Sequence, residues 1–379
     1  MHKKITKFKS LLTLLLVSTS LFLNGCINTE NPKQVTSKEN IESESISNSQ
    51  VSSLNNAEIH FIDTGNSDAI LIKEGETFTL IDGGDNDDEA SMVRYLNNQG
   101  VKNIKYLIST HAHADHLGGL DAVVKNFAVE NAFVSNGSAD SKSYRDFINA
   151  LSNKGLSPSV PLENNKFFLE NSYFEVLNTN GGSTTNEQSL VLLFTNKNDK
   201  ILFTGDAEAG TEKEIMPKLC DVDLLKVGHH GSRSSSTDEF LQKTNPEYAV
   251  IQVGKGNSYG HPHKETMDKL KRLGIEVHRN DECSDIIFIS TGDGVSTNCK
   301  AGSYTPGKRE SSNSHIQNND QQINNQQIGQ NDEIVYYTPK GKSYHSTRDC
   351  SALIRSKTIL SGTIKESNKL DPCDRCYGK

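Results

Sequence analysis

The segment His111-Ala112-His113-Ala114-Asp115-His116 places three imidazoles and one carboxylate within six residues. It follows an apolar run, Tyr106-Leu107-Ile108, and precedes Leu117-Gly118-Gly119, an order typical of a strand, a turn and a helix start. Histidines two residues apart can bind one cation from a turn, while Asp115 and His116 can face a second cation about 3.5–4 Å away. The segment therefore predicts a two-metal site at the end of a strand.

Around this segment, short apolar runs alternate with amphipathic stretches. The runs predicted as strands are 59–62, 69–72, 78–81, 104–108, 133–134, 174–177, 190–194, 201–203, 224–227, 249–253 and 286–289. The stretches predicted as helices are 89–99, 117–126, 143–154, 209–219, 238–244 and 263–273. Many strands with interleaved helices predict an α/β sandwich over residues 57–300.

The N-terminus has the pattern of a bacterial lipoprotein signal peptide over residues 1–25. Four lysines precede an apolar run, 11–23, that is short for a membrane span, and the run ends in Leu23-Asn24-Gly25-Cys26. This end resembles a lipobox, so we expect Cys26 to be lipidated and the remainder to stay on the outer face of the cell membrane. An uncleaved anchor and plain secretion are the alternatives, and each also places the rest of the chain outside.

Composition separates the remaining regions. Residues 26–56 are rich in Ser, Asn, Glu and Thr and predict a flexible tether, and the Asn/Gln-rich residues 301–332 predict a linker. Removal of residues 1–25 takes away four lysines and no acids, so the formal net charge would change from −8 to −12. An acidic chain argues against a broad nucleic-acid groove, although a metal site can still bind a phosphate locally.

The motif and several further segments resemble a known family. The HxHxDH pattern is similar to the signature of the metallo-β-lactamase fold superfamily, which implies a four-layer αββα sandwich, hydrolase activity and one or two metals over about 57–297. A closer resemblance is to the hydrolase domain of ComEC-type DNA-uptake proteins. It rests on seven blocks in the same order: 61–65, 68–72, 81–84, 189–192, 202–206, 226–232 and 259–263.

The resemblance implies roles for residues far from the motif. It makes Asp206 a ligand that bridges two cations, and it leaves His229, His230 and His261 to supply a late ligand and a substrate-facing group. We favour His261 as ligand and His230 as substrate-facing, with the reverse assignment open and His229 pointing elsewhere. Asp82 is expected to orient a ligating histidine, since such ligands need an acceptor behind them.

One departure from the wider family concerns the metal. No histidine occurs between His116 and His229, and Asn186 lies where an intermediate ligand is usual, a loss that ComEC-like members share. A site with fewer nitrogen donors favours more oxygen-seeking ions, so manganese is an alternative to zinc. His263 is expected to serve only as a helix-start residue.

The chemistry expected of this site is hydrolysis by activated water. Asp115 would accept or steer the proton, while His230, Lys226 and the hydroxyls of Ser232 and Ser234 would receive the leaving group or phosphate oxygens; a solvent-exposed strand-end role for Lys226 stays open. The resemblance favours an extracellular phosphodiesterase or nuclease acting on DNA. Hydrolysis of a lactam, lactone or thioester, and a non-catalytic binding lipoprotein, are the alternatives.

Residues 333–379 form a separate basic module with nine Lys and Arg against five Asp and Glu. Its His345, Cys350, Cys373 and Cys376 are spaced as ligands of a structural zinc, and the pattern resembles small Ada-like zinc modules. A Cys373–Cys376 disulfide is the competing interpretation. The positive charge suggests contact with DNA or an anionic wall polymer. In the preceding domain Cys283 and Cys299 could pair, which would leave Cys220 as a buried thiol.

Overall fold

The computed structural model describes residues 56–308 and, further on, residues 334–348, 350, 352–353, 356, 358–363, 367, 369 and 371–373. The predicted signal peptide, Cys26, nearly all of the tether, most of the linker and Cys376 lie outside the described residues. The chain divides into two compact units, Met1–Glu310 and Ser311–Lys379. None of the described helices is long and apolar enough to cross a bilayer.

The described part of the first unit contains two mixed seven-stranded sheets. The first has the order β14 (Val295–Thr297), β13 (Ile286–Ser290), β1 (Ala57–Phe61), β2 (Ile70–Glu74), β3 (Thr77–Ile81), β4 (Asn103–Ser109), β5 (Ala128–Val134). The second has the order β12 (Glu276–Arg279), β11 (Tyr248–Ile251), β10 (Leu224–Lys226), β9 (Asp199–Phe203), β8 (Val191–Asn196), β7 (Tyr173–Asn178), β6 (Lys166–Phe168).

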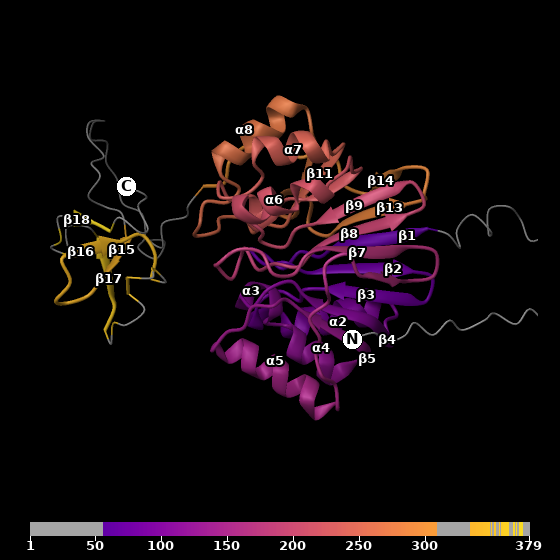
Figure 1. Cartoon of the computed structure of the whole chain (residues 1–379), viewed down its shortest axis with the longest axis horizontal. Coiled ribbons are helices and arrows are strands. Elements are labelled where there is room, and N and C mark those ends of the chain that lie inside the picture. Colours follow the sequence, from indigo (N-terminus) through magenta and orange to yellow (C-terminus); the bar gives the residue numbers. More distant parts are fainter. Residues whose placement is uncertain are drawn as a thin grey trace, which may run out of the picture. The chain divides into compact units, whose positions relative to one another are not determined.

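Helices cover the outer face of each sheet, as Figure 1 shows. The first sheet carries η1 (Asn86–Asp88), α2 (Glu89–Asn98), α3 (Ala114–Leu117), α4 (Leu120–Asn126) and α5 (Lys142–Asn153). The second carries α6 (Ala209–Ile215), η2 (Met216–Lys218), α7 (Asp238–Thr244) and α8 (Lys264–Leu273), and the loops hold η3 (Gly228–Gly231) and α9 (Asn280–Cys283). The predicted four-layer αββα sandwich is thereby confirmed.

The core between the sheets is aromatic. Phe174 lies 5.1 Å from Phe194 and 6.3 Å from Phe203 between ring centroids, and Phe61 lies 6.2 Å from Phe203. Because helices cover the outer faces, β8 is buried at every position and its sequence is continuously apolar from Val191 to Phe194. Both faces of each sheet are thus packed, which leaves the loops at the strand ends to carry polar chemistry.

Strand direction brings the loops of interest together. β3 pairs in parallel with β4, and β9, β10 and β11 pair in parallel with one another. Carboxyl ends of parallel strands meet at one edge of a sheet, so the residues that follow these strands cluster there. The segments concerned begin at Asp82, Thr110, Thr204 and Val227.

The first unit extends further than predicted at its C-terminal end, and its cysteines are partly as predicted. Residues 301–308, assigned to the linker, are bound to the first unit: Gly302 N donates to Val277 O at 2.6 Å, and Gly307 N donates to Pro262 O at 2.8 Å. Cys283 and Cys299 form a disulfide. Cys220 is a free thiol, but it is half-buried rather than buried, because it lies at the edge of the core.

The second unit is a small four-stranded sheet with the order β17 (Leu360–Thr363), β15 (Ile334–Tyr337), β16 (Ser343–His345), β18 (Asp371–Pro372). Its buried apolar cluster in the described residues comprises only Cys350, Leu353 and Cys373, with Tyr336 and Ile359 packed against it. So small a core gives little stabilisation, which favours an added crosslink or metal.

Candidate metal centre

The histidine motif occupies the turn between β4 and α3. His111 and His113 lie in the turn, and Asp115 and His116 lie in the first turns of α3. Asp206 follows β9 from the other sheet. The predicted long-range convergence therefore occurs, because the turn after β4 and the turn after β9 meet at the same edge of the sandwich.

His229 and His230 enter the site from a strained turn. Both have left-handed backbone conformations, with φ of 49° and 52°. Residues other than glycine rarely adopt such angles, at a cost of about 1–3 kcal/mol each, and they persist where surrounding contacts hold them. His230 is held by Gln252, whose carbonyl lies 2.9 Å from His230 Nδ1. This contact leaves His230 Nε2 facing the cluster.

Four side chains form the centre of the cluster. Donor atoms of Asp115, His116, Asp206 and His230 all lie within 4.8 Å of one another. His116 Nε2 is 3.3 Å from Asp206 Oδ1, and His230 Nε2 is 3.3 Å from Asp115 Oδ2. His116, Asp206 and His230 are each at most 1% exposed. This group has the donor types of a metal site with nitrogen and carboxylate ligands.

A second group adjoins the first through Asp206. His111 Nε2 lies 3.0 Å from His113 Nδ1 and 3.8 Å from Asp206 Oδ2. Asp206 Oδ1 lies nearest His116, whereas Oδ2 lies 3.8 Å from His111 Nε2 and 3.9 Å from His230 Nε2. Asp206 therefore lies between the His111–His113 pair and the four-donor group.

The residues present fit divalent cations. His116 Nε2 and Asp206 Oδ1 are buried and form no hydrogen bond. Burial and the neighbouring His116 hold the pKa of His111 well below its usual value, and burial lowers the pKa of His113, so both imidazoles are neutral and can donate a lone pair. Burial alone would lower the pKa of His116, but Asp206, Asp82 and Asp68 raise it well above its usual value. A cation would replace this bound proton as the neutralising charge.

Asp82 lies behind the cluster in the role expected for it. Its Oδ2 is 2.8 Å from His116 Nδ1, and it accepts hydrogen bonds from Thr110 N at 2.7 Å and Thr110 Oγ1 at 2.6 Å. Burial raises the pKa of Asp82, against the opposing effect of His116. These contacts fix the orientation of the His116 ring, so that Nε2 points toward Asp206.

Asp68 and Lys226 form a buried ion pair beneath the cluster. Asp68 was not identified from the sequence, although a carboxylate at the head of the apolar run 69–72 was a signal for it. It also lies 3.7 Å from His116 Nδ1 and 3.4 Å from His230 Nδ1. Lys226 is fully buried, and its Nζ also donates to Gly205 O at 3.2 Å. The exposed-lysine alternative is wrong, and this ammonium group does not face a substrate.

The late histidines need correction. His230, rather than His261, joins the four-donor group. The His261 ring lies behind His230 at 6.0 Å between centroids, and burial, with His230 and His229 nearby, lowers its pKa to about 2. His229 does not point elsewhere: its Nε2 is 3.8 Å from Asp206 Oδ2 and its side chain is 25% exposed. His230 therefore takes the position in the donor group that was expected of His261, and His229, rather than His261, is the more accessible imidazole.

The rim beside His229 is polar. His229 Nδ1 lies 3.2 Å from Glu208 Oε1, 3.3 Å from Ser234 Oγ and 3.3 Å from Asn186 Nδ2. Ser234 Oγ is in turn 3.0 Å from Ser232 Oγ. Asn186 therefore borders the site at the level of His229. His263, expected to start a helix, is the N-cap of α8.

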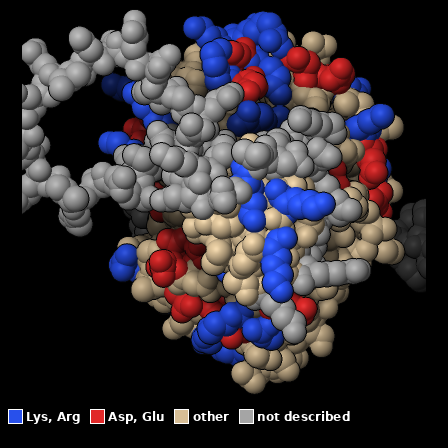
Figure 2. Space-filling view, turned by 90° about the vertical axis from the view of Figure 1, so that its left-hand side faces the viewer, with Lys and Arg blue, Asp and Glu red and all other residues tan. Residues whose placement is uncertain are grey.

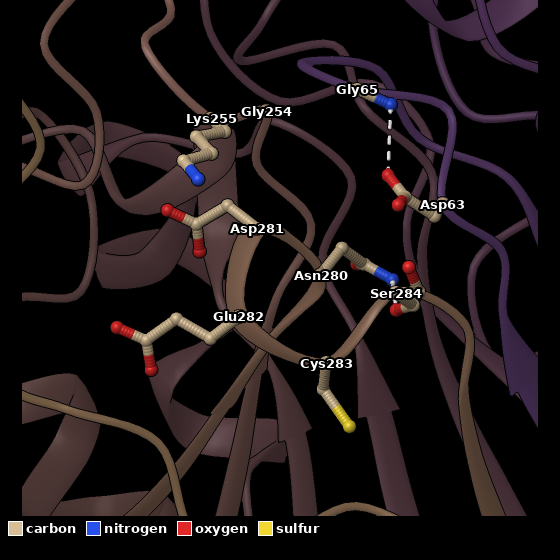
Figure 3. A pocket seen from close by; sticks show the side chains of 9 residues that line it. All are labelled: Asp63, Gly65, Gly254, Lys255, Asn280, Asp281, Glu282, Cys283 and Ser284. Atoms are coloured by element: carbon tan, nitrogen blue, oxygen red, sulfur yellow. Dashed lines mark hydrogen bonds between the residues drawn. The ribbon is translucent and has the colours of Figure 1, made fainter.

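A separate hollow of about 580 Å³ lies at the ends of β1, β11 and β12, and Figure 3 shows the side chains that line it. None of the clustered histidines lines it. Its acids are already partnered, since Asp281 pairs with Arg279 at 2.7 Å and Glu282 accepts from Ser303 N at 2.7 Å. This hollow is therefore separate from the candidate metal centre.

The edge of the sandwich that carries α3 in Figure 1 faces the viewer in Figure 2. In this view Lys and Arg side chains and Asp and Glu side chains occur in small groups on the atoms that are coloured.

In the second unit, donor atoms of His345, Cys350 and Cys373 lie within 4.8 Å of one another. Cys350 Sγ and Cys373 Sγ are 3.7 Å apart. This distance is far beyond a disulfide of about 2.05 Å, and it matches two thiolates that each lie about 2.3 Å from a tetrahedral zinc. Three of the four predicted ligands thus converge, and the fourth, Cys376, is outside the described residues.

The Asp68–Lys226 pair yields a stability prediction. Lys226→Met should lower the free energy of unfolding by about 3–5 kcal/mol, because it leaves Asp68 buried without its cation. Lys264→Met is the control: its pair with Asp268 joins side chains that are 71% and 54% exposed, and its loss should leave the free energy of unfolding nearly unchanged. Urea denaturation followed by circular dichroism measures both, and equal losses would contradict the prediction.

Comparison with known proteins gives the family. The model of the Metallo-beta-lactamase superfamily matches residues 62–255, slightly more than half of the chain. ComE operon protein 3 of Bacillus subtilis is 30% identical over 204 residues, which are 53% of this chain and 26% of that protein. Recombination protein 2 of Haemophilus influenzae is 28% identical over 227 residues, 58% of this chain and 27% of that protein. The chain thus spans about a quarter of the length of these relatives.

Among solved structures, the metallo-beta-lactamase fold protein YhfI of Bacillus subtilis aligns with a TM-score of 0.44 and 10% identity, over 62% of this chain and 100% of that one. The matched residues include the histidine motif, Asp206 and His230. These residues form the four-donor group and the adjoining His111–His113 pair. By this family match, the chain belongs to the metallo-β-lactamase superfamily, as a metal-dependent hydrolase.

Proposed function

We propose that the protein is a metal-dependent phosphodiesterase that cleaves nucleic acid. The observation that carries the proposal is the convergence of Asp115, His116, Asp206 and His230 at one point beside His111 and His113. The similarity to proteins named for competence and recombination supports DNA as the substrate class.

The chain's own groups suit this reaction. Divalent cations bound here would activate water and stabilise negative charge on a phosphoryl oxygen. Asp115, an ionised carboxylate at the edge of the cluster, can accept a proton; burial opposes its charge, but the hydrogen bond from His230 and the charge of His116 lower its pKa. His229 and Ser234, which lie at the accessible rim, are placed to contact the leaving group.

The first test is metal-dependent cleavage by the purified full chain, loaded with zinc or with manganese. Single-stranded DNA, a small phosphodiester and a chromogenic lactam serve as substrates. We expect both phosphodiesters to be cleaved, and His111→Ala and Asp206→Ala each to lower the rate at least about 100-fold, because each removes a metal donor. A chelator should abolish cleavage.

Asp293→Ala is the control for Asp206→Ala, since Asp293 is exposed in the turn between β13 and β14. Its activity should equal that of the wild type. Phosphodiester cleavage that survives His111→Ala and Asp206→Ala would refute the mechanism. Cleavage of the lactam alone would favour the carbonyl hydrolase, and no cleavage of any substrate by metal-loaded protein would favour a binding lipoprotein.

We further propose that the second unit holds one structural zinc, supported by the 3.7 Å separation of the Cys350 and Cys373 thiols. Cys350→Ser should reduce the zinc content of the purified chain by one ion, measured by plasma mass spectrometry. Cys220→Ser, at a free thiol of the first unit, should leave it unchanged. An unchanged content in Cys350→Ser would exclude this zinc, and two thiols that react only after reduction, in addition to those of the Cys283–Cys299 disulfide, would indicate the Cys373–Cys376 disulfide.

We also propose that the mature protein is anchored at the outer face of the cell membrane through lipidated Cys26. Support comes from the order of lysines, apolar run and Leu23-Asn24-Gly25-Cys26. Protein expressed in a bacterium should partition into the detergent phase of a cloud-point extraction, because acyl chains bury apolar surface there. Cys26→Ser should move it to the aqueous phase; equal partitioning of both forms would reject the lipid anchor.

A further inference from the structure

Three rings form a continuous stack from the surface to the candidate metal centre. Tyr259 and His261 lie 5.5 Å apart between centroids with an interplanar angle of 17°, and His261 and His230 lie 6.0 Å apart at 27°. His230 Nε2 is 3.3 Å from Asp115 Oδ2 in the four-donor group. The outermost ring, Tyr259, is 59% exposed, whereas His261 is 5% exposed.

The loop that carries the stack is held by one side chain. Asn257 Oδ1 accepts hydrogen bonds from Tyr259 N at 3.2 Å and from His261 N at 3.0 Å. Asn257 Nδ2 donates to His261 O at 2.7 Å and to Gly254 O at 2.9 Å. The exposed tyrosine is therefore fixed by its backbone, so a ligand that stacks on it does not have to order the loop.

A basic side chain flanks the stack. The guanidinium group of Arg233 lies beside His263, with Nη2 at 3.5 Å from His263 Nε2, and the His263 ring lies 4.7 Å from that of His261. The guanidinium group pairs with Glu265 at 3.4 Å, but both side chains are more than half exposed, so this pair is weak in water. Arg233 can therefore contact a phosphate near the stack.

We propose that Tyr259 is a base-stacking subsite that holds a nucleobase of single-stranded nucleic acid while the adjoining backbone passes Arg233 and enters the metal centre. This inference rests on the proposed function and names its substrate class. An aromatic face binds any base, and stacking of this kind requires a base whose face is not covered by a neighbour in a duplex. One local stack and one arginine also suit an acidic protein better than an extended basic groove would.

The test measures the affinity of the metal-loaded full chain for a short, fluorescently labelled single-stranded DNA with cleavage-resistant phosphorothioate linkages. Tyr259→Ala should weaken binding about 5- to 100-fold, the range expected for one lost base stack. Tyr259→Phe and Tyr259→Trp should bind nearly as well as the wild type. Phe168→Ala is the matched control, because Phe168 in β6 is also 59% exposed and should not affect binding.

An oligonucleotide of the same length with abasic sites separates stacking from phosphate contacts. The wild type should bind it as weakly as Tyr259→Ala binds the normal DNA, with no further loss on substitution. Equal affinity of wild type and Tyr259→Ala for the normal DNA, or an equal loss for both oligonucleotides, would overturn the inference.

A small phosphodiester without a base, methyl p-nitrophenyl phosphate, separates this inference from the proposed function. Tyr259→Ala should hydrolyse it at the wild-type rate, and a parallel loss would show damage to the metal centre and overturn the subsite. The wild type could also bind DNA in a base-dependent way and yet cleave no phosphodiester. This result would support the base-stacking subsite and refute the proposed phosphodiesterase function.

Discussion

Buried charge is the constraint on which this structure depends. Asp68, Asp82 and Asp206 are each about 1% exposed, and an isolated carboxylate in such a place is too costly to persist. Each is therefore surrounded by opposite charge or hydrogen-bond donors: Asp68 by Lys226, Asp82 by Thr110 and His116, and Asp206 by the imidazoles. In the Asp206 group, His116 Nε2 and Asp206 Oδ1 are buried without hydrogen bonds, and they lie where imidazole and carboxylate donors suitable for a cation converge.

The stability of the packed sandwich offsets the free-energy cost of burying these charges. Phenylalanine rings fill the space between the sheets, and separate apolar clusters fill the space beneath the helices. Since these three cores hold the strands rigidly, the loops at one edge can carry strained residues such as His229 and His230. Rigid strand ends also keep Asp206 of one sheet close to the motif of the other sheet, which a metal centre of fixed geometry requires.

The sequence predicted those parts of the site that are local or that belong to a recognisable block. The six-residue motif was sufficient for His111, His113, Asp115 and His116, because spacing within one turn determines what those side chains can reach. Asp206 and Asp82 came from their place after apolar strands and from the family resemblance. In the first unit, the short strands β6, β12 and β14 were not predicted; β12 and β14 contain a single apolar residue each, which gives no apolar run.

Which of the late histidines lies nearest the donor group could not be predicted. It depends on left-handed backbone angles at His229 and His230, and no periodic sequence pattern encodes such angles. The roles predicted for Lys226 were wrong because a lysine at a strand end is usually solvated. Its burial is explained only by its partner Asp68, which is distant in the sequence.

The route by which the chain leaves the first unit has a consequence for domain truncation. A Cβ atom at Gly307 would lie 1.9 Å from the carbonyl oxygen of His261, so the departing backbone is pressed against the loop that carries the ring stack. A shortened protein that stops at residue 300 would keep every metal donor of the first unit and the disulfide, yet it would lose the packing behind that loop. The functional boundary of the domain therefore lies beyond the last strand of its sheets. A side chain at residue 307 would displace the loop that carries Tyr259 and His261.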